Sequence, residues 1–123
     1  MVNNDFKLID TGYLYSPWNG TLREFAGEVY HRDEYRTEFG RLIVPEHTHF
    51  IVKDGRGRTI KKFDCAANEG YIHNKNVWLR EPDKRQAADI LIEYEETLIS
   101  KLRLQIENHE SLIESLKDIA NEE

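Results

Sequence analysis

The sequence is poor in the residues that mark several large classes of protein. Cys65 is the single cysteine among 123 residues, which excludes an intrachain disulfide and a cysteine-rich zinc site. No apolar run reaches the roughly 18 residues of a membrane span, so we expect no membrane partner. Residues 1–5 lack the basic and then apolar pattern of a signal peptide, which predicts a cytoplasmic protein.

Positive charge is scarce as well. The chain has 17 Lys and Arg against 23 Asp and Glu, a net charge of -6. Proteins that bind duplex DNA neutralise many phosphates with basic side chains, so the sequence predicts no duplex nucleic acid as partner. Residues 1–82 hold 12 basic and 12 acidic side chains, whereas residues 83–123 hold 5 and 11. This contrast predicts two parts, with a boundary between residues 82 and 83.

The acidic part, residues 83–123, has the pattern of a long helix or a helix pair. It begins after Pro82, contains no glycine, and repeats apolar residues at steps of three and four. A turn between two helices would fall at the weakest stretch, residues 108–111. An unbroken helix over 83–120 would be about 57 Å long at about 1.5 Å per residue, more than an 82-residue domain covers. We therefore expect a homo-oligomer through the helices, with His109 as a polar register residue.

The balanced part, residues 1–82, is predicted to be a small antiparallel β domain. Residues 49–53 and 58–63 are β-branched and aromatic runs around a glycine-containing loop, which is the signal of a hairpin. Residues 41–44 and 77–79 predict two further strands. Residues 13–20 are rich in aromatic and turn residues, and residues 21–30 fit neither the helical nor the strand period. The fold class is thus α+β, a small antiparallel β domain followed by a long C-terminal helix or helix pair.

The tip of the predicted hairpin is a candidate phosphate site. Gly55 and Gly57 alternate with Arg56 and Arg58, so backbone N–H groups and guanidinium forks could meet one anion. An ordinary solvated turn explains the same residues. Arg103 flanks the apolar stripe of the helix, where it could pair with a facing acid or reach a pocket at an interface.

Catalysis finds little support in the motifs. The nucleophile elbow, the phosphate-binding loop and the zinc-protease motif are all missing, so we expect no enzyme, no catalytic residue and no cofactor. One alternative is a metal enzyme, because His47 and His49 would share one face of a strand and Cys65 or His73 could add a ligand. Two half-exposed histidines at the start of a strand are the better explanation of the pair, and our prediction is that no metal is bound.

The segment Asn76–Asp83, which leads into a helix containing Ile92–Glu95, belongs to a layout of β domain and C-terminal helices that resembles a known family. This family comprises the phage proteins that act as sponges for Thoeris immune signals. The resemblance implies that the protein sequesters a cyclic ADP-ribose isomer made by a TIR-domain enzyme, without cleaving it, in the host cytoplasm. Cyclic oligonucleotides are a further ligand class that it implies, together with homo-oligomers formed through the helices.

A ligand of that kind would need cations for its pyrophosphate, an aromatic slot for its adenine and amides for its ribose hydroxyls. The corresponding candidates in this chain are Arg56, Arg58, Arg85 and Arg103 for phosphate, Trp18, Phe50 and Phe63 for the base, and Asn76 for a hydroxyl. Core packing is the competing interpretation for most of the aromatic residues, Phe63 included. The alternative function is an oligomeric adaptor whose β domain binds another protein.

Overall fold

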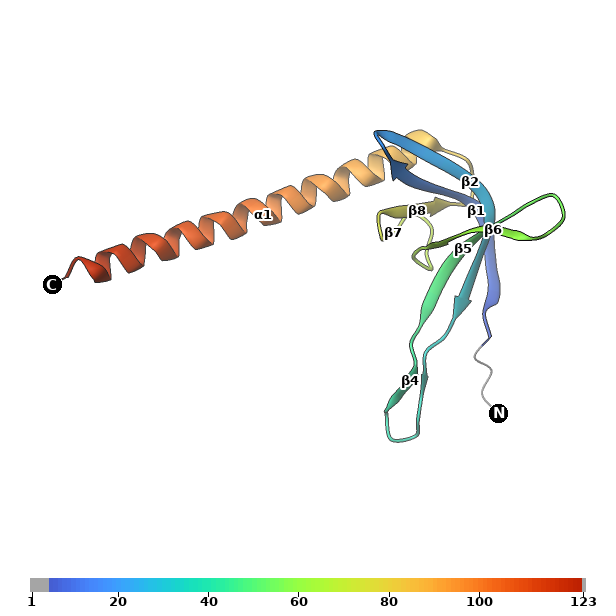
Figure 1. Ribbon diagram of the computed structural model, residues 1–123, viewed down its shortest axis with the longest axis horizontal. Coiled ribbons are helices and arrows are strands. Elements are labelled where there is room, and N and C mark those ends of the chain that lie inside the picture. The colour runs from blue at the N-terminus through green and yellow to red at the C-terminus, as the bar shows by residue number, and fades with distance from the viewer. Residues whose placement is uncertain (1–4, 123) are drawn as a thin grey trace. The chain divides into compact units, whose positions relative to one another are not determined.

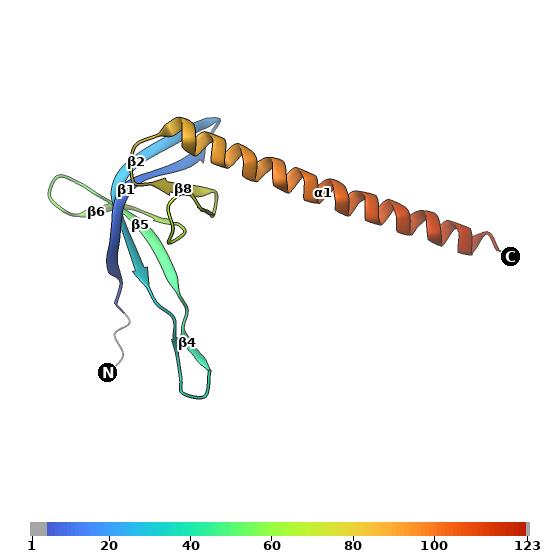
Figure 2. The same ribbon diagram turned by 180° about the vertical axis from the view of Figure 1, so that it is seen from behind.

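The computed structural model describes residues 5–122, and Figures 1 and 2 show it from opposite sides. The strands and the helix are, in chain order, β1 (Lys7–Trp18), β2 (Thr21–Arg32), β3 (Tyr35–Arg36), β4 (Leu42–Val44), β5 (His47–Lys53), β6 (Thr59–Asp64), β7 (Ile72–His73), β8 (Asn76–Leu79) and α1 (Lys84–Ala120). Six strands form an antiparallel sheet in the order β6-β5-β2-β1-β8-β7, and β3 pairs separately with β4. The predicted α+β class is confirmed.

Most of the predicted elements are present. The hairpin is β5–β6, the two further strands are β4 and β8, and the helical stripe is α1. Residues 108–111 lie inside α1, so the alternatives left open by the sequence resolve to one helix. Within residues 5–122, no helix has both the length and the apolarity that a membrane span requires.

The two longest strands, β1 and β2, were not predicted: β1 includes most of the aromatic, turn-rich stretch 13–20, and β2 covers residues 21–30, which fitted neither period. They are joined by Asn19 and Gly20, whose φ angles are 47° and 75°. Trp18 pairs directly with Thr21 across this connection. A two-residue hairpin turn with positive φ at both positions matches the right-handed twist of the strands, which is why an Asn-Gly pair is favoured there.

Both faces of the sheet carry a core. On one face, the buried side chains are Leu14, Val29, Phe50, Val52, Cys65 and Trp78. On the other face, the start of the helix is packed against the sheet through Tyr15, Val77, Leu79, Ala87 and Leu91. Because strand residues alternate between faces, neighbours such as Leu14 and Tyr15 belong to different cores.

The helix begins at Lys84, one residue later than the start at residue 83 that the sequence predicts. Asp83 is the N-cap, and its Oδ1 accepts a hydrogen bond from the backbone N–H of Gln86 at 2.9 Å. The backbone N–H of Asp83 in turn donates to the hydroxyl of Tyr15 at 2.8 Å. The pKa of Tyr15 is raised to about 12, mainly by burial of its hydroxyl and secondly by a hydrogen bond with Glu24.

The chain divides into two compact units, Met1–Leu91 and Ile92–Glu123. The first unit holds the sheet and the first two turns of α1, because Ala87 and Leu91 are buried in one of the sheet's cores. The predicted boundary between residues 82 and 83 lies next to the start of the helix, whereas the boundary between the two compact units lies between Leu91 and Ile92.

Gly27 is a position where β2 and β5 lie too close for a side chain. A Cβ atom there would overlap the carbonyl oxygen of Ile51 and approach Cε1 of Phe50 to 2.6 Å. We expect Gly27→Ala to lower the free energy of unfolding by about 1–3 kcal/mol, the usual effect of overpacking. Urea unfolding followed by circular dichroism measures this loss. Gly55→Ala is the matched control, because nothing lies within 4 Å of a Cβ at Gly55. Equal stability of the two variants would contradict the prediction.

Candidate functional site

The predicted phosphate site at the β5–β6 tip already holds a carboxylate of the chain itself. Oδ1 of Asp54 accepts hydrogen bonds from the backbone N–H groups of Arg56 at 2.8 Å and Arg58 at 3.0 Å. Oδ2 accepts one from Nε of Arg58 at 2.9 Å. These bonds, led by the backbone N–H of Arg58, lower the pKa of Asp54. A phosphate at this tip would have to displace an ionised internal carboxylate.

The other predicted site residues lie in different places. Phe50 is fully buried in the core, so it presents no surface to a ligand. Asn76 is also buried, and its side-chain Nδ2 donates to the carbonyl oxygen of Asp64 at 2.8 Å. Arg85 is exposed in the first turn of α1, and Arg103 is exposed in the unit that starts at Ile92. The structure therefore does not bring the eight predicted residues together.

Two of the eight, Trp18 and Phe63, lie beside the same cation, Arg23, which sequence reasoning did not single out. The guanidinium carbon of Arg23 lies 5.0 Å from the ring centre of Trp18 and 5.9 Å from that of Phe63. Phe25 lies 5.5 Å from the same guanidinium carbon, and the Nζ of Lys61 lies 5.2 Å from the Phe25 ring centre. We call these five residues the aromatic–cation cluster.

Strand register explains how the cluster forms. Arg23 and Phe25 are two residues apart on β2, so both side chains lie on one face of the sheet, and the same is true of Lys61 and Phe63 on β6. Trp18 is the last residue of β1, and its side chain lies on the same face as that of Arg23, because Trp18 pairs with Thr21 and Ser16 pairs with Arg23. Phe25 and Phe63 bring the two pairs together, with their ring centres 5.0 Å apart.

Arg23 is half-buried, and no carboxylate of the described residues 5–122 pairs with it. No ion pair to Arg23 or Lys61 is found among the residues that the structure describes. The Nε of Arg23 is buried without a hydrogen-bond partner, and its Nη2 makes only a long bond, 3.4 Å, to Oγ of Ser16. A buried donor without an acceptor costs about 1–3 kcal/mol. An acceptor supplied from outside the chain would remove this cost at Arg23.

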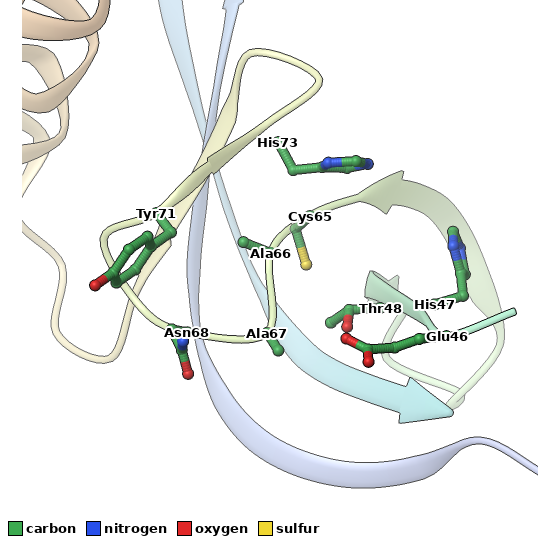
Figure 3. Close-up of a pocket in the computed structure, with 9 residues that line it drawn as sticks. All are labelled: Glu46, His47, Thr48, Cys65, Ala66, Ala67, Asn68, Tyr71 and His73. Atoms are coloured by element: carbon green, nitrogen blue, oxygen red, sulfur yellow. The ribbon is translucent and has the colours of Figure 1, made fainter. Parts of the chain in front are cut away.

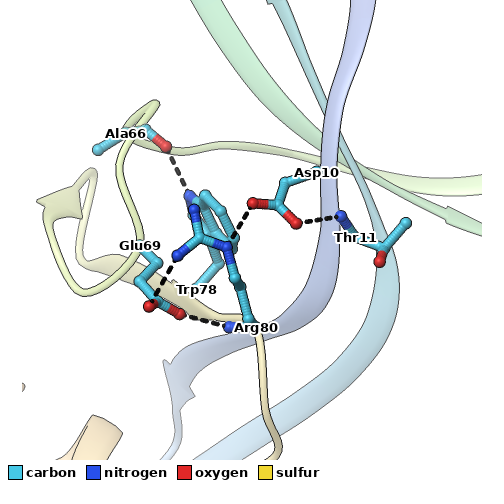
Figure 4. A network of polar contacts seen from close by, with 6 residues as sticks. All are labelled: Asp10, Thr11, Ala66, Glu69, Trp78 and Arg80. Atoms are coloured by element: carbon cyan, nitrogen blue, oxygen red, sulfur yellow. Dashed lines mark hydrogen bonds and ion pairs between the residues drawn. The ribbon is translucent and has the colours of Figure 1, made fainter.

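Arg80 shows the contrasting arrangement of an arginine that is fully used by the fold (Figure 4). Its Nε donates to Oδ2 of Asp10 at 2.6 Å, and its Nη1 donates to Oε1 of Glu69 at 3.0 Å. Next to it, Nε1 of Trp78 donates to the carbonyl oxygen of Ala66 at 2.7 Å. This network ties β1 and β8 to the loop before β7 and leaves Arg80 neutralised.

A polar pocket of about 370 Å³ lies between β5 and the segment that follows β6 (Figure 3). It is lined by Glu46, His47, Thr48, Cys65, Ala66, Ala67, Asn68, Tyr71 and His73. Burial is the largest cause that raises the pKa of the Cys65 thiol to about 12. A thiol that stays protonated at neutral pH is a poor nucleophile, which disfavours a Cys65–His73 pair as a catalytic unit.

His47 and His49 share one face of β5, as the strand period predicts. Their ring centres are 5.6 Å apart. The Nε2 atom of His47 lies 3.1 Å from Oδ1 of Asp64. Within residues 5–122, however, no three or more His, Cys, Asp or Glu side chains are placed to hold a metal ion. His49 is packed against the ring of Phe6, with centres 4.3 Å apart, which makes it part of the interior.

Among these places, the aromatic–cation cluster combines an exposed ring with two cations, Arg23 and Lys61, that form no ion pair with another described residue. Trp18 is 58% exposed. Cations suit phosphate oxygens and an exposed indole suits a flat heterocycle, so the cluster has the donor set of a nucleotide site. No protein-family model, curated protein or solved structure matches this chain, so the assignment of the site rests on this geometry.

Proposed function

We propose that the protein binds a small phosphate-bearing nucleotide at the aromatic–cation cluster and leaves it chemically unchanged. The observation that carries the proposal is Arg23, a half-buried cation with an unused donor and no carboxylate partner among the described residues. Such a cation gains most from an anion supplied by a ligand.

The recognition would divide between the two kinds of side chain. Phosphate oxygens accept hydrogen bonds from the guanidinium of Arg23 and the ammonium of Lys61, which both lie over Phe25. A base stacks on the exposed indole of Trp18 and gains about 1–3 kcal/mol. Two positive charges match the two negative charges of one pyrophosphate, so the net charge of -6 does not oppose binding.

The resemblance to Thoeris sponges gives this binding a biological purpose. A protein that holds a cyclic ADP-ribose isomer in the host cytoplasm would keep the signal from its effector and thereby suppress the antiphage defence. Sequestration needs no activated nucleophile, and the raised pKa of Cys65 is consistent with that requirement. The same cluster chemistry extends to a cyclic oligonucleotide, which also has flat bases and phosphates.

The proposal is tested by titrating the protein calorimetrically with cyclic ADP-ribose isomers and cyclic dinucleotides. We expect Arg23→Gln to weaken binding by about 10–100-fold, because a hydrogen bond to a charged group contributes about 1.5–3 kcal/mol. Ligand recovered intact from the heat-denatured complex, identified by mass spectrometry, would establish binding without cleavage.

Arg56→Gln is the matched control, since Arg56 is an exposed arginine at the β5–β6 tip. We expect this variant to keep the wild-type affinity within about twofold, because about 0.4 kcal/mol corresponds to that ratio. Loss of binding in Arg56→Gln together with full binding in Arg23→Gln would move the site to the tip and refute the cluster.

The second candidate function, an adaptor that binds another protein, is favoured by the β3–β4 hairpin. Phe39 in the connection between these strands is 91% exposed, and Leu42 and Ile43 beside it are exposed as well. Apolar groups gathered at a hairpin tip are typical of a contact surface. If the folded protein shows no heat of binding with any of the nucleotides in the calorimetric titration, the adaptor function becomes the better-supported candidate.

A further inference from the structure

A second group of basic side chains surrounds the ring of Phe6, which comes just before β1. The guanidinium carbon of Arg32 lies 4.7 Å from the centre of this ring, and the Nζ of Lys62 lies 5.9 Å from it. The ring centres of His49 and His47 lie 4.3 Å and 5.8 Å from the same point. We call these five residues the Phe6 cluster.

Strand pairing brings the cluster to one face of the sheet. Arg32 on β2 pairs with His47 on β5, and His49 lies two residues further along β5. Lys62 on β6 pairs with Ile51, the next residue of β5 on that face. Because neighbouring residues of a strand alternate between faces, Lys62 points away from the aromatic–cation cluster, which contains the preceding residue of β6. The two clusters therefore lie on opposite faces of the sheet.

Two nitrogen atoms of the Phe6 cluster are buried without a hydrogen-bond partner. They are Nε of Arg32 and Nδ1 of His49, a residue that is only 3% exposed. The Nη2 of Arg32 makes one long hydrogen bond, 3.3 Å, to the carbonyl oxygen of Pro45. Native proteins rarely leave buried polar atoms unpaired, because each gives up its bonds to water on folding. Two such atoms beside one ring point to an acceptor supplied from outside the chain.

The charge around His49 is mainly positive. Within residues 5–122, no ion pair of Arg32 or Lys62 is found, whereas Nε2 of His47 lies 3.1 Å from Oδ1 of Asp64. Burial is the largest cause that lowers the pKa of His49, followed by the positive charges of Lys62 and His47. Asp64 acts in the opposite direction, and Arg32 adds to the lowering. An anion in the cluster would oppose the repulsion by these cations.

The ring of Phe6 is a weak substitute for such an anion. The face of an aromatic ring attracts cations, but it is a poor acceptor of hydrogen bonds. An oxyanion has full negative charge and several lone pairs, and it binds guanidinium, imidazolium and ammonium groups through charge-assisted hydrogen bonds. Lys62 is exposed and His47 is half-buried, so the cluster reaches solvent along the β5–β6 side.

We propose that the Phe6 cluster binds a small oxyanion of the phosphate or sulfate class, with Arg32, His49 and Lys62 as its donors. Nε of Arg32 and Nδ1 of His49 supply hydrogen bonds from the interior, and the ammonium of Lys62 supplies one from the solvent side. Binding favours the protonated form of His49, so it strengthens as the pH falls. This site is separate from the nucleotide site and lies on the other face of the sheet.

The test follows the imidazole of His49 by nuclear magnetic resonance in the full chain, with sulfate as the probe. Sulfate keeps its double charge while the pH is lowered from about 8 to about 4, and we expect it to raise the pKa of His49 by about one unit or more. His49→Phe identifies the signal by its loss. Sodium chloride at the same ionic strength is the salt control, and it should have a smaller effect.

Three variants locate the anion within the cluster. Arg32→Gln should weaken sulfate binding, read from the same signal, by about tenfold or more, because it removes a charge-assisted donor. Lys62→Gln should weaken it by about twofold to fivefold, since water screens an exposed cation. Lys7→Gln is the matched control and should keep the wild-type affinity. Lys7 is exposed beside Phe6 in the chain, and its pairing with His31 places it on the face opposite Arg32.

A pKa of His49 that is the same in sulfate and in chloride would overturn the proposal. An equal loss of affinity in Lys7→Gln and Lys62→Gln would overturn it as well. Amide spectra show whether each variant is folded, and the exposed position of Lys62 keeps the test available if Arg32→Gln does not fold. Tighter binding of glycerol phosphate than of inorganic phosphate would support a metabolite phosphate as the ligand, and the reverse order would support the free ion.

The signal of His49 reports on the Phe6 cluster alone. Failure of sulfate to change it leaves nucleotide binding at the aromatic–cation cluster untouched, because that site lies on the opposite face. Failure of nucleotides to bind likewise leaves the sulfate response of His49 as expected.

Discussion

Replacing Trp78 by alanine is expected to lower the free energy of unfolding by about 3–5 kcal/mol, a large part of the roughly 5–15 kcal/mol that holds a small domain folded. Trp78 is completely buried and is packed with Leu14 and Phe50 in one core of the sheet. The variant loses this apolar contact. It also leaves the carbonyl oxygen of Ala66 without the indole donor that lies 2.7 Å from it.

Urea unfolding at fixed protein concentration, followed by far-ultraviolet circular dichroism, measures this effect without relying on tryptophan fluorescence. Trp78→Phe retains most of the apolar volume and should lose less stability than the alanine variant. Trp18→Ala is the exposed control, for which we expect a change within about 0.5 kcal/mol. A Trp78→Ala protein within that same range would show that the core does not depend on this residue.

Lowering the pH from 7 to 4 is expected to remove about 3 kcal/mol of stability through His49, at about 1.4 kcal/mol for each pKa unit. Burial, followed by the positive charge of Lys62, lowers the pKa of His49 from 6.5 to about 4. In the unfolded chain the imidazole takes up a proton as the pH falls through about 6.5, whereas in the folded chain it stays neutral until about 4. The contribution is therefore complete above pH 6.5 and is lost between 6.5 and 4.

His49→Phe is the variant that isolates this effect, since a phenyl ring fills a similar volume beside Phe6 and cannot bind a proton. We expect it to flatten the dependence of the urea midpoint on pH between 6.5 and 4. His73→Gln removes an exposed histidine and should leave the dependence as it is in the wild type. If His49→Phe keeps the full wild-type dependence, another group is responsible for it.

The parts of the fold that sequence reasoning identified are those whose residues determine local structure. The β5–β6 hairpin follows from β-branched and aromatic runs around a turn, and α1 follows from the helical period after Pro82. Strands β1 and β2 escaped this reasoning because they change surroundings along their length. Tyr13, Leu14, Tyr15 and Ser16 are all at least partly buried in succession, and Gly12 pairs with Gly27 at the point where the strands approach their neighbours.

The candidate site shows why a ligand site is harder to predict than a strand. Trp18 and Phe63 were singled out by residue type, and both belong to the aromatic–cation cluster. Arg23 was missed, because nothing near it in the sequence marks it as unpaired. Its importance comes from the pairing of β1 with β2 and the approach of β6, which a single sequence does not reveal. The clearest local signal, the pair of arginines at the β5–β6 tip, proved to surround the carboxylate of Asp54.

The hydrogen bond between the Asp83 amide and the Tyr15 hydroxyl has a consequence for how the helix comes into existence. Starting an isolated helix is the unfavourable step, because several residues must be ordered before the first hydrogen bond forms. Here a strand hydroxyl fixes the N-cap, and the sheet buries Ala87 and Leu91 one and two turns later. The sheet thus serves as a template that nucleates the helix, and the remaining turns propagate from an end that is already formed.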